Sequence, residues 1–91
     1  MKTLHLVLKQ KWFDMIASGE KLAEYRRMTD YWEKRICANR FDIEKVVFHR
    51  GYTNTTCEKY VKAISVDVGR KEWGADPMTE YYVIRLEGGW K

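Results

Sequence analysis

Three charged side chains fall within the six positions from Lys21 to Arg26, in a segment that otherwise alternates like a β-strand. Charged residues are depleted in strands, so this cluster restricts where the strand can lie in a fold. Residues two apart on a strand share a face, which places Glu24 and Arg26 together with Leu22. Lys21 is out of phase and has to reach that face from the turn at Gly19. The segment is therefore either an edge strand with solvated charges or a strand with one face lining a polar pocket.

Hydrophobic periodicity along the rest of the chain predicts an α+β domain with five short strands and two helices. The first helix has an apolar face and ends at Gly19, a residue suited to a C-terminal cap. The second begins at Thr29 or Asp30 and ends near Asn39. Strands without helical crossovers tend to pair antiparallel, so we expect the sheet to curl into a small barrel. The predicted strands are the charged segment and residues 4–9, 45–50, 58–68 and 81–86, and the first helix covers residues 10–18.

Length and composition are those of one small domain over residues 1–91, with 45% hydrophobic residues to form a single core. No apolar run is long enough to span a bilayer and no signal-peptide pattern is present, so we expect a cytoplasmic protein without a membrane partner. Cys37 and Cys57 have no metal-ligand spacing and are expected to be free, partly buried thiols. No motif for a cofactor or metal is present.

The net charge is +4, with acidic residues scattered among the basic ones. Longer runs of basic residues would be typical of proteins that coat DNA without sequence preference. The charge therefore favours a confined anionic ligand or a short piece of nucleic acid.

The pattern Gly19-x-Lys21-x-x-Glu24-x-Arg26 resembles the signature of the ASCH-domain family, small proteins with a PUA-like β-barrel. The resemblance extends over most of the chain in the same order. It implies a single ASCH/PUA-like domain that binds RNA or a nucleotide-like ligand. The other matching segments are residues 4–9, 12–16, 31–35, 48–52, 69–74 and 82–86.

Lys21, Glu24 and Arg26 are the main candidate site. A lysine beside a carboxylate can act as an acid/base pair, and an arginine can bind a phosphate or carbonyl through two hydrogen bonds. The alternative is a structural ion pair. The resemblance suggests that Lys9, at the end of the first strand, opens onto the same cleft.

Two aromatic residues in polar loops, Tyr52 and Trp73, are candidates for stacking on a base. Trp12, like Phe13 and Phe48, lies on an apolar face and is expected in the core. Trp32 fits either role. Glu72 could bring a second carboxylate over the cleft, although a solvated position is the simpler interpretation.

His5 and His49 are each isolated in the sequence, without a metal-ligand partner at a useful spacing. Both are interpreted as structural residues. His49 is the stronger candidate for a ligand contact, because Arg50 and Tyr52 follow it.

Two functions are compatible with these features: a binding module for RNA or a nucleotide-like ligand, and a small metal-independent hydrolase using Lys21 and Glu24. One family branch hydrolyses acetylated cytidine and carries a Gly-x-Lys-Thr-x-Thr pattern; another is described as a ribonuclease. Here Leu22 and Glu24 replace the two threonines. A carboxylate cannot serve as the same oxygen nucleophile, although Glu24 could act as a base for water or for a 2′-hydroxyl, with Arg26 stabilising the phosphate.

Overall fold

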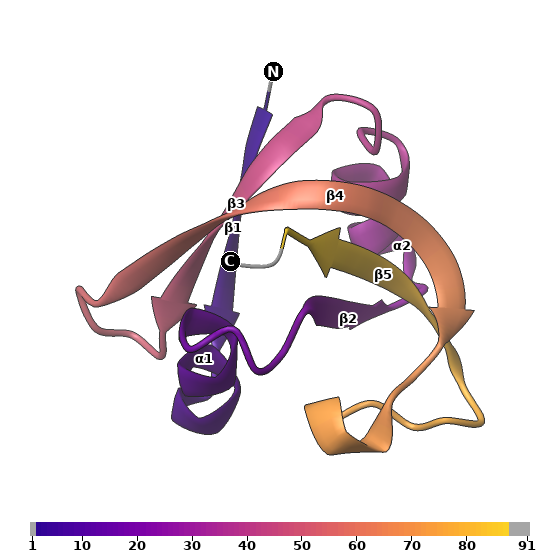
Figure 1. Ribbon diagram of the computed structural model, residues 1–91. Helices are drawn as coiled ribbons and strands as arrows, with labels where there is room; N and C mark the ends of the chain where they lie inside the picture. Colours follow the sequence, from indigo (N-terminus) through magenta and orange to yellow (C-terminus); the bar gives the residue numbers. More distant parts are fainter. Residues whose placement is uncertain (1, 88–91) are drawn as a thin grey trace.

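One mixed five-stranded sheet, strongly curled into a half-barrel, forms the body of the protein (Figure 1). The computed structural model describes residues 2–87. The α+β architecture expected from the sequence is confirmed. In the sheet order the strands are β1 (Lys2–Leu8), β3 (Ile43–Arg50), β4 (Thr56–Val68), β5 (Glu80–Leu86) and β2 (Ala23–Arg27).

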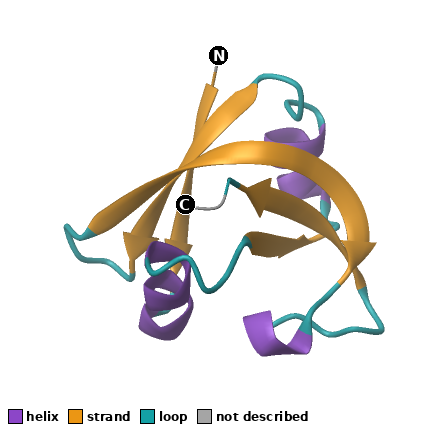
Figure 2. Cartoon of the chain, in the orientation of Figure 1, coloured by secondary structure: helices purple, strands orange, loops and turns teal. Residues whose placement is uncertain are grey.

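Three of the four strand pairs are antiparallel, as expected, but β1 and β3 are parallel. The chain between these two strands contains α1 (Gln10–Ala17), β2 and α2 (Asp30–Trp32), the last continuing as the π-helical turn η1 (Glu33–Cys37). Parallel strands need such a long crossover, because the chain must return to the end of the sheet from which it started. Figure 2 shows the helices at either end of this crossover.

The curl of the sheet is concentrated in β4, which arches over β5 and β2 in Figure 1. Its register with β5 shifts between Val61 and Ala63. A bulge of this kind increases local twist and changes which side chains face inward. Accordingly Val61 and Ile64, three positions apart, both pack on the main core.

The helices close the core as their sequences predict. Phe13 and Ile16 of α1 are buried, and Gly19 follows the helix with φ +86°. Thr29 is the N-cap of α2, since its hydroxyl oxygen accepts a hydrogen bond from the Trp32 N–H at 3.3 Å. Ile36 of η1 is completely buried.

Two apolar clusters lie on opposite faces of β5, one built on Tyr82 and Ile84 and the other on Tyr81 and Val83. The larger one joins both helices to β1, β3 and β5, and the smaller one lies under the loop that precedes β5. Cys37 and Cys57 are free and half-buried, as predicted. Within residues 2–87, no helix combines the length and apolar character needed to cross a membrane. The smaller cluster consists of Ala23, Ala75, Tyr81 and Val83, with Tyr25 and Trp73 packed against it.

Candidate functional site

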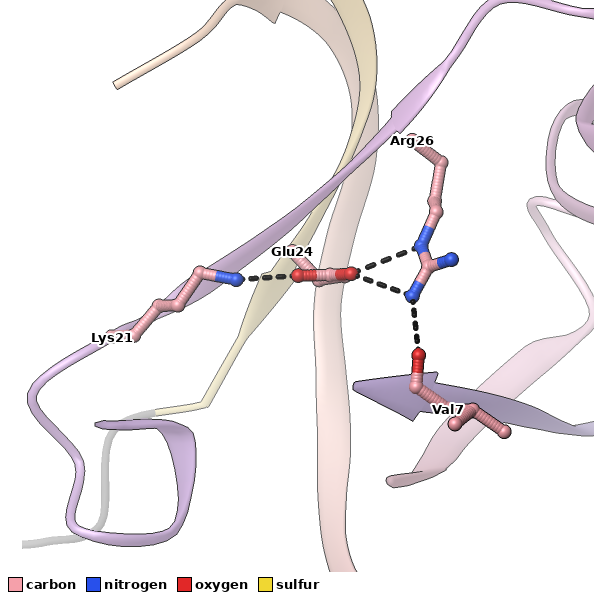
Figure 3. A network of polar contacts seen from close by, with 4 residues as sticks. All are labelled: Val7, Lys21, Glu24 and Arg26. Atoms are coloured by element: carbon pink, nitrogen blue, oxygen red, sulfur yellow. Dashed lines mark hydrogen bonds and ion pairs between the residues drawn. The ribbon is translucent and has the colours of Figure 1, made fainter. Parts of the chain in front are cut away.

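Glu24 lies between two cationic side chains in the interior of the protein (Figure 3). Lys21 Nζ donates a hydrogen bond to Oε1 of Glu24. Arg26 donates to Oε2 from Nε at 2.9 Å and from Nη2 at 2.8 Å. Lys21 is 2% exposed and Glu24 is 5% exposed. The structure thus brings together the three residues singled out in the sequence, and it does so with both carboxylate oxygens engaged.

Lys21 reaches this network from the turn after α1. Gly19 has the left-handed conformation that the turn requires. The Lys21 N–H then donates to the carbonyl of Met15 at 2.9 Å, which fixes the backbone before β2 begins. On β2 itself, Glu24 points toward the network while the flanking Ala23 and Tyr25 pack on the smaller apolar cluster. The predicted alternation of Glu24 against Ala23 and Tyr25 is therefore correct, whereas Leu22, predicted to share the face of Glu24, precedes the first residue of β2 and does not line the cleft beside this network.

Arg26 also connects the two outermost strands of the sheet. Its Nη2 donates to the carbonyl of Val7 on β1 at 3.3 Å, and its guanidinium carbon lies 5.0 Å from the centre of the Trp32 ring. Within the described residues, Nη1 has no hydrogen-bond partner (Figure 3). The guanidinium is therefore held in a fixed orientation with one donor group to spare.

A cleft of about 250 Å³ opens beside these residues. Lys9 and Trp73 line it together with the network, so five of the six predicted site residues border one cavity. Three cations and one carboxylate give the cleft a positive net charge. Its full lining is Val7, Leu8, Lys9, Trp12, Lys21, Glu24, Tyr25, Arg26, Trp73 and Gly74.

Trp12, which was expected in the core, is only half-buried and lines this cleft. Lys21 Nζ lies 5.7 Å from the centre of its ring and Lys11 Nζ lies 4.7 Å away. Trp12 packs against the main apolar cluster from the margin of the apolar face of α1, so the expected core position is met only in part. Phe13 next to it is 4% exposed and occupies the core position.

Two other candidates lie away from the cleft. Tyr52 is 99% exposed in the turn between β3 and β4 and is not part of the lining. Glu72 accepts a hydrogen bond from Arg70 Nε at 2.8 Å, and this bond lowers the pKa of the Glu72 carboxyl group. Glu72 therefore has a partner outside the cleft and contributes no second carboxylate to it.

A second cleft, of about 460 Å³, lies on the other side of Tyr25 and Trp73, which border both cavities. Arg70 stacks over the Trp73 ring at 4.2 Å, and Arg85 Nη2 bonds to Asp67 at 3.1 Å. Burial raises the pKa of the Tyr25 hydroxyl, so this ring remains a neutral hydrogen-bonding group. Nothing in the sequence indicated this cleft, because its lining comes from Leu22, β2, β4, β5 and the loop between the last two strands.

The two histidines were interpreted as separate structural residues, but they contact each other: Nδ1 of His5 and Nε2 of His49 are 3.0 Å apart. Among residues 2–87 no three or more His, Cys, Asp or Glu side chains gather in a way that could hold a metal ion.

Comparison with protein-family models gives no match, and comparisons with curated proteins and with solved structures give no significant match either.

Proposed function

We propose that this protein is a small binding module that holds RNA or a nucleotide-like ligand in the cleft lined by Lys21, Glu24 and Arg26. The observation that carries the proposal is the fixed guanidinium of Arg26. It is oriented by Glu24 and the Val7 carbonyl, and it keeps a donor for a further acceptor. An arginine held in this way offers planar recognition of a phosphate or carbonyl oxygen at little cost in side-chain entropy.

The walls of the cleft suit a nucleotide-like ligand. Trp73 supplies an aromatic surface beside the cations, and base stacking on such a ring is tolerant of sequence. Lys9 adds an exposed cation to the lining of the cleft. The volume is slightly below the ~300–1,000 Å³ of typical small-molecule pockets, which favours one base with its sugar or phosphate over a large cofactor. The resemblance to ASCH domains supports the same class of ligand.

The alternative is a small metal-independent hydrolase, either a ribonuclease or an enzyme like the acetylcytidine amidohydrolases, in which Lys21 and Glu24 act as the catalytic pair. Direct contact between these two side chains favours it. Against it, both oxygens of Glu24 accept hydrogen bonds and the residue is 5% exposed. A general base has to reach the proton it removes, directly or through one water. The geometry therefore supports a positioning role for Glu24 better than a catalytic one.

Fluorescence anisotropy with a labelled short single-stranded RNA, competed by cytidine and by cytidine monophosphate, tests the proposal. We expect affinity to fall with a shallow slope between about 50 and 200 mM salt, because few phosphates are contacted. Arg26→Gln should weaken binding, whereas Arg27→Gln, the exposed next residue on β2, should not. Absence of binding to all three probes at low salt, or equal loss in both variants, would refute the proposal.

A further inference from the structure

The second cleft, of about 460 Å³, shares two of its walls with the first one. Tyr25 and Trp73 border both cavities and form a ridge between them. Both side chains are half-buried and pack against the smaller apolar cluster, which holds the ridge in place. A ligand in the first cleft can therefore continue over the ridge into the second without leaving the protein surface.

The second cleft has a positive net charge and hydrogen-bond donors to spare. Its charged lining consists of Lys62, Arg70, Arg85 and Asp67. Arg85 donates to Asp67 from Nη2, and Arg70 donates to Glu72 from Nε. Within the described part of the chain, the other guanidinium nitrogens of these two arginines have no hydrogen-bond partner. The cleft can thus supply several donors to one anionic group.

The floor of the cleft is formed by β4 and β5. Arg85 stands opposite Ala63 in the register of these strands, whereas Asp67, which it binds, stands opposite Tyr81. The Arg85 side chain therefore extends along the sheet and across the floor of the cleft. Lys62 joins it from the register shift in β4, a kind of irregularity that often redirects a side chain toward a site.

Hydrogen bonds within the loop between β4 and β5 fix the opposite wall. The Gly69 N–H donates to the carbonyl of Asp76 at 3.1 Å. The N–H groups of Trp73 and Ala75 donate to the carbonyl of Arg70 at 2.9 and 3.1 Å. The Arg70 guanidinium is in turn held over the Trp73 ring. This wall exists before a ligand arrives, so binding requires little additional ordering.

The Tyr25 hydroxyl lies among the charged groups of both walls. Burial raises its pKa, the positive charges of Arg85 and Arg70 lower it, and the negative charges of Asp67 and Glu72 raise it. The hydroxyl therefore stays neutral and can donate a hydrogen bond beside the two guanidinium groups.

We propose that the second cleft binds the nucleotide that follows or precedes, in a single-stranded RNA, the nucleotide held in the first cleft. The inference rests on the function proposed above and extends it to two consecutive nucleotides. The RNA backbone crosses the ridge, Arg85 and Lys62 bind the phosphate on its far side, and the exposed guanidinium plane of Arg70 offers a surface on which the second base stacks.

The size and the mixed lining of the cleft favour a nucleotide over a chain of phosphates. The volume lies within the ~300–1,000 Å³ of typical small-molecule pockets. Apolar side chains, Leu22 and Val68, line the cleft together with the cations. A sugar and a base would use both kinds of surface, whereas a polyphosphate would use only the cations.

Isothermal titration calorimetry at about 50 mM salt with 5′-CMP and with the dinucleotide pCpC tests the inference. We expect pCpC to bind about tenfold or more tightly than CMP, because it gains hydrogen bonds between charged groups. Arg85→Gln should abolish most of this gain and leave CMP affinity unchanged, whereas Arg26→Gln should weaken both ligands. Lys71→Gln removes an exposed cation that lines neither cleft and should change neither affinity.

The double variant Asp67→Asn, Arg85→Gln keeps the net charge of the wild type and should lose the pCpC gain as well, which separates the guanidinium from charge alone. Thermal melting checks that each variant is folded. Equal affinity for CMP and pCpC, both sensitive to Arg26→Gln, would overturn this inference and leave the proposed function intact. Absence of binding by both ligands would overturn the two together.

Two further outcomes would also overturn the assignment to a second nucleotide. Equal weakening of CMP and pCpC by Arg85→Gln would mean that the phosphate of a single nucleotide already occupies the second cleft. CTP that binds as tightly as pCpC, with the same loss in Arg85→Gln, would assign the cleft to a polyphosphate.

Discussion

Gly74 packs directly on the indole ring of Trp12: a Cβ atom added to Gly74 would lie 2.6 Å from Cζ2 of that ring. Gly74 also has φ +80°, a conformation that other residues rarely adopt. This contact seats the loop before β5 on α1. It therefore holds Trp73, the neighbour of Gly74, at the edge of the cleft.

Gly74→Ala should destabilise the protein by about 1–3 kcal/mol, through steric conflict and backbone strain together. Gly51→Ala is the matched control, because Gly51 has φ +59° but no atom within 4 Å of an added Cβ. Urea unfolding measures the free energy of unfolding of each variant. Both variants suffer backbone strain, so the additional loss in Gly74→Ala reports the steric conflict with Trp12. Equal losses would mean that the contact with Trp12 contributes nothing.

Glu24→Gln should cost about 3–5 kcal/mol of unfolding free energy, because it leaves Lys21 buried beside a neutral group. Glu58→Gln breaks the Lys45–Glu58 pair, whose side chains are 33% and 57% exposed, and should cost much less. Chemical denaturation of both variants measures the difference. A Glu24→Gln protein as stable as Glu58→Gln would show that the buried network is not coupled to folding.

Trp73→Ala should reduce RNA affinity by about 1–3 kcal/mol while leaving the dependence of affinity on salt nearly unchanged, because stacking releases no counterions. Arg26→Gln should reduce both the RNA affinity and the dependence of that affinity on salt. Anisotropy titrations at several salt concentrations distinguish the two. If Trp73→Ala flattened the slope as much as Arg26→Gln, the assignment of Trp73 to stacking would be wrong.

Hydrolysis of acetylated cytidine by the wild-type protein should be undetectable by chromatography, since Glu24 stands where the amidohydrolase pattern has a threonine. Any RNA cleavage should need no added metal and should disappear in folded Lys21→Met. Methionine is chosen because alanine would leave a cavity at this buried position as well. Rapid turnover of acetylated cytidine would show that position 24 was misinterpreted, and nuclease activity retained in Lys21→Met would place cleavage elsewhere.

Asp14 on α1 binds Arg50 at the end of β3, with Oδ1 and Nε 3.0 Å apart, and this hydrogen bond lowers the pKa of Asp14 from 3.8. A group with a lowered pKa in the folded state stabilises the fold above its unfolded pKa and loses that effect as pH falls through the folded pKa. The difference in melting temperature between wild type and Asp14→Asn should therefore be present at pH 7 and shrink below about pH 4. A melting-temperature difference that stayed the same at all pH values would exclude the Asp14–Arg50 ion pair as its source.

Most of the fold could be predicted because local patterns agree with it. The alternating leucines, the apolar face of α1 and the turn at Gly19 each act over a few residues, and the position of Lys21, Glu24 and Arg26 follows from strand alternation and that turn. The parallel pairing of β1 with β3 could not be predicted, because it depends on the end of the sheet to which the long segment between the two strands returns.

Contacts between distant segments were also invisible in the sequence. The position of Trp12 depends on Gly74 packing against its ring, and the proximity of His5 to His49 depends on the register of β1 with β3. The larger second cleft likewise needs side chains from three strands and a loop. In each case the contact joins segments that are far apart in the chain. Hydrophobic periodicity reports only on residues that are close in sequence, so it carries no sign of such a contact.

The strand order has a consequence for the sequence of events during synthesis. Among the described residues, β2 pairs only with β5, and Ala23 stands opposite Arg85. The ribosome therefore releases the Lys21–Arg26 segment long before its backbone partner exists, and the charges stay hydrated until β5 emerges. Such long-range pairing slows folding and leaves an open strand edge in the meantime. Polar residues at this edge would keep the nascent chain from pairing with its neighbours while the half-barrel is incomplete.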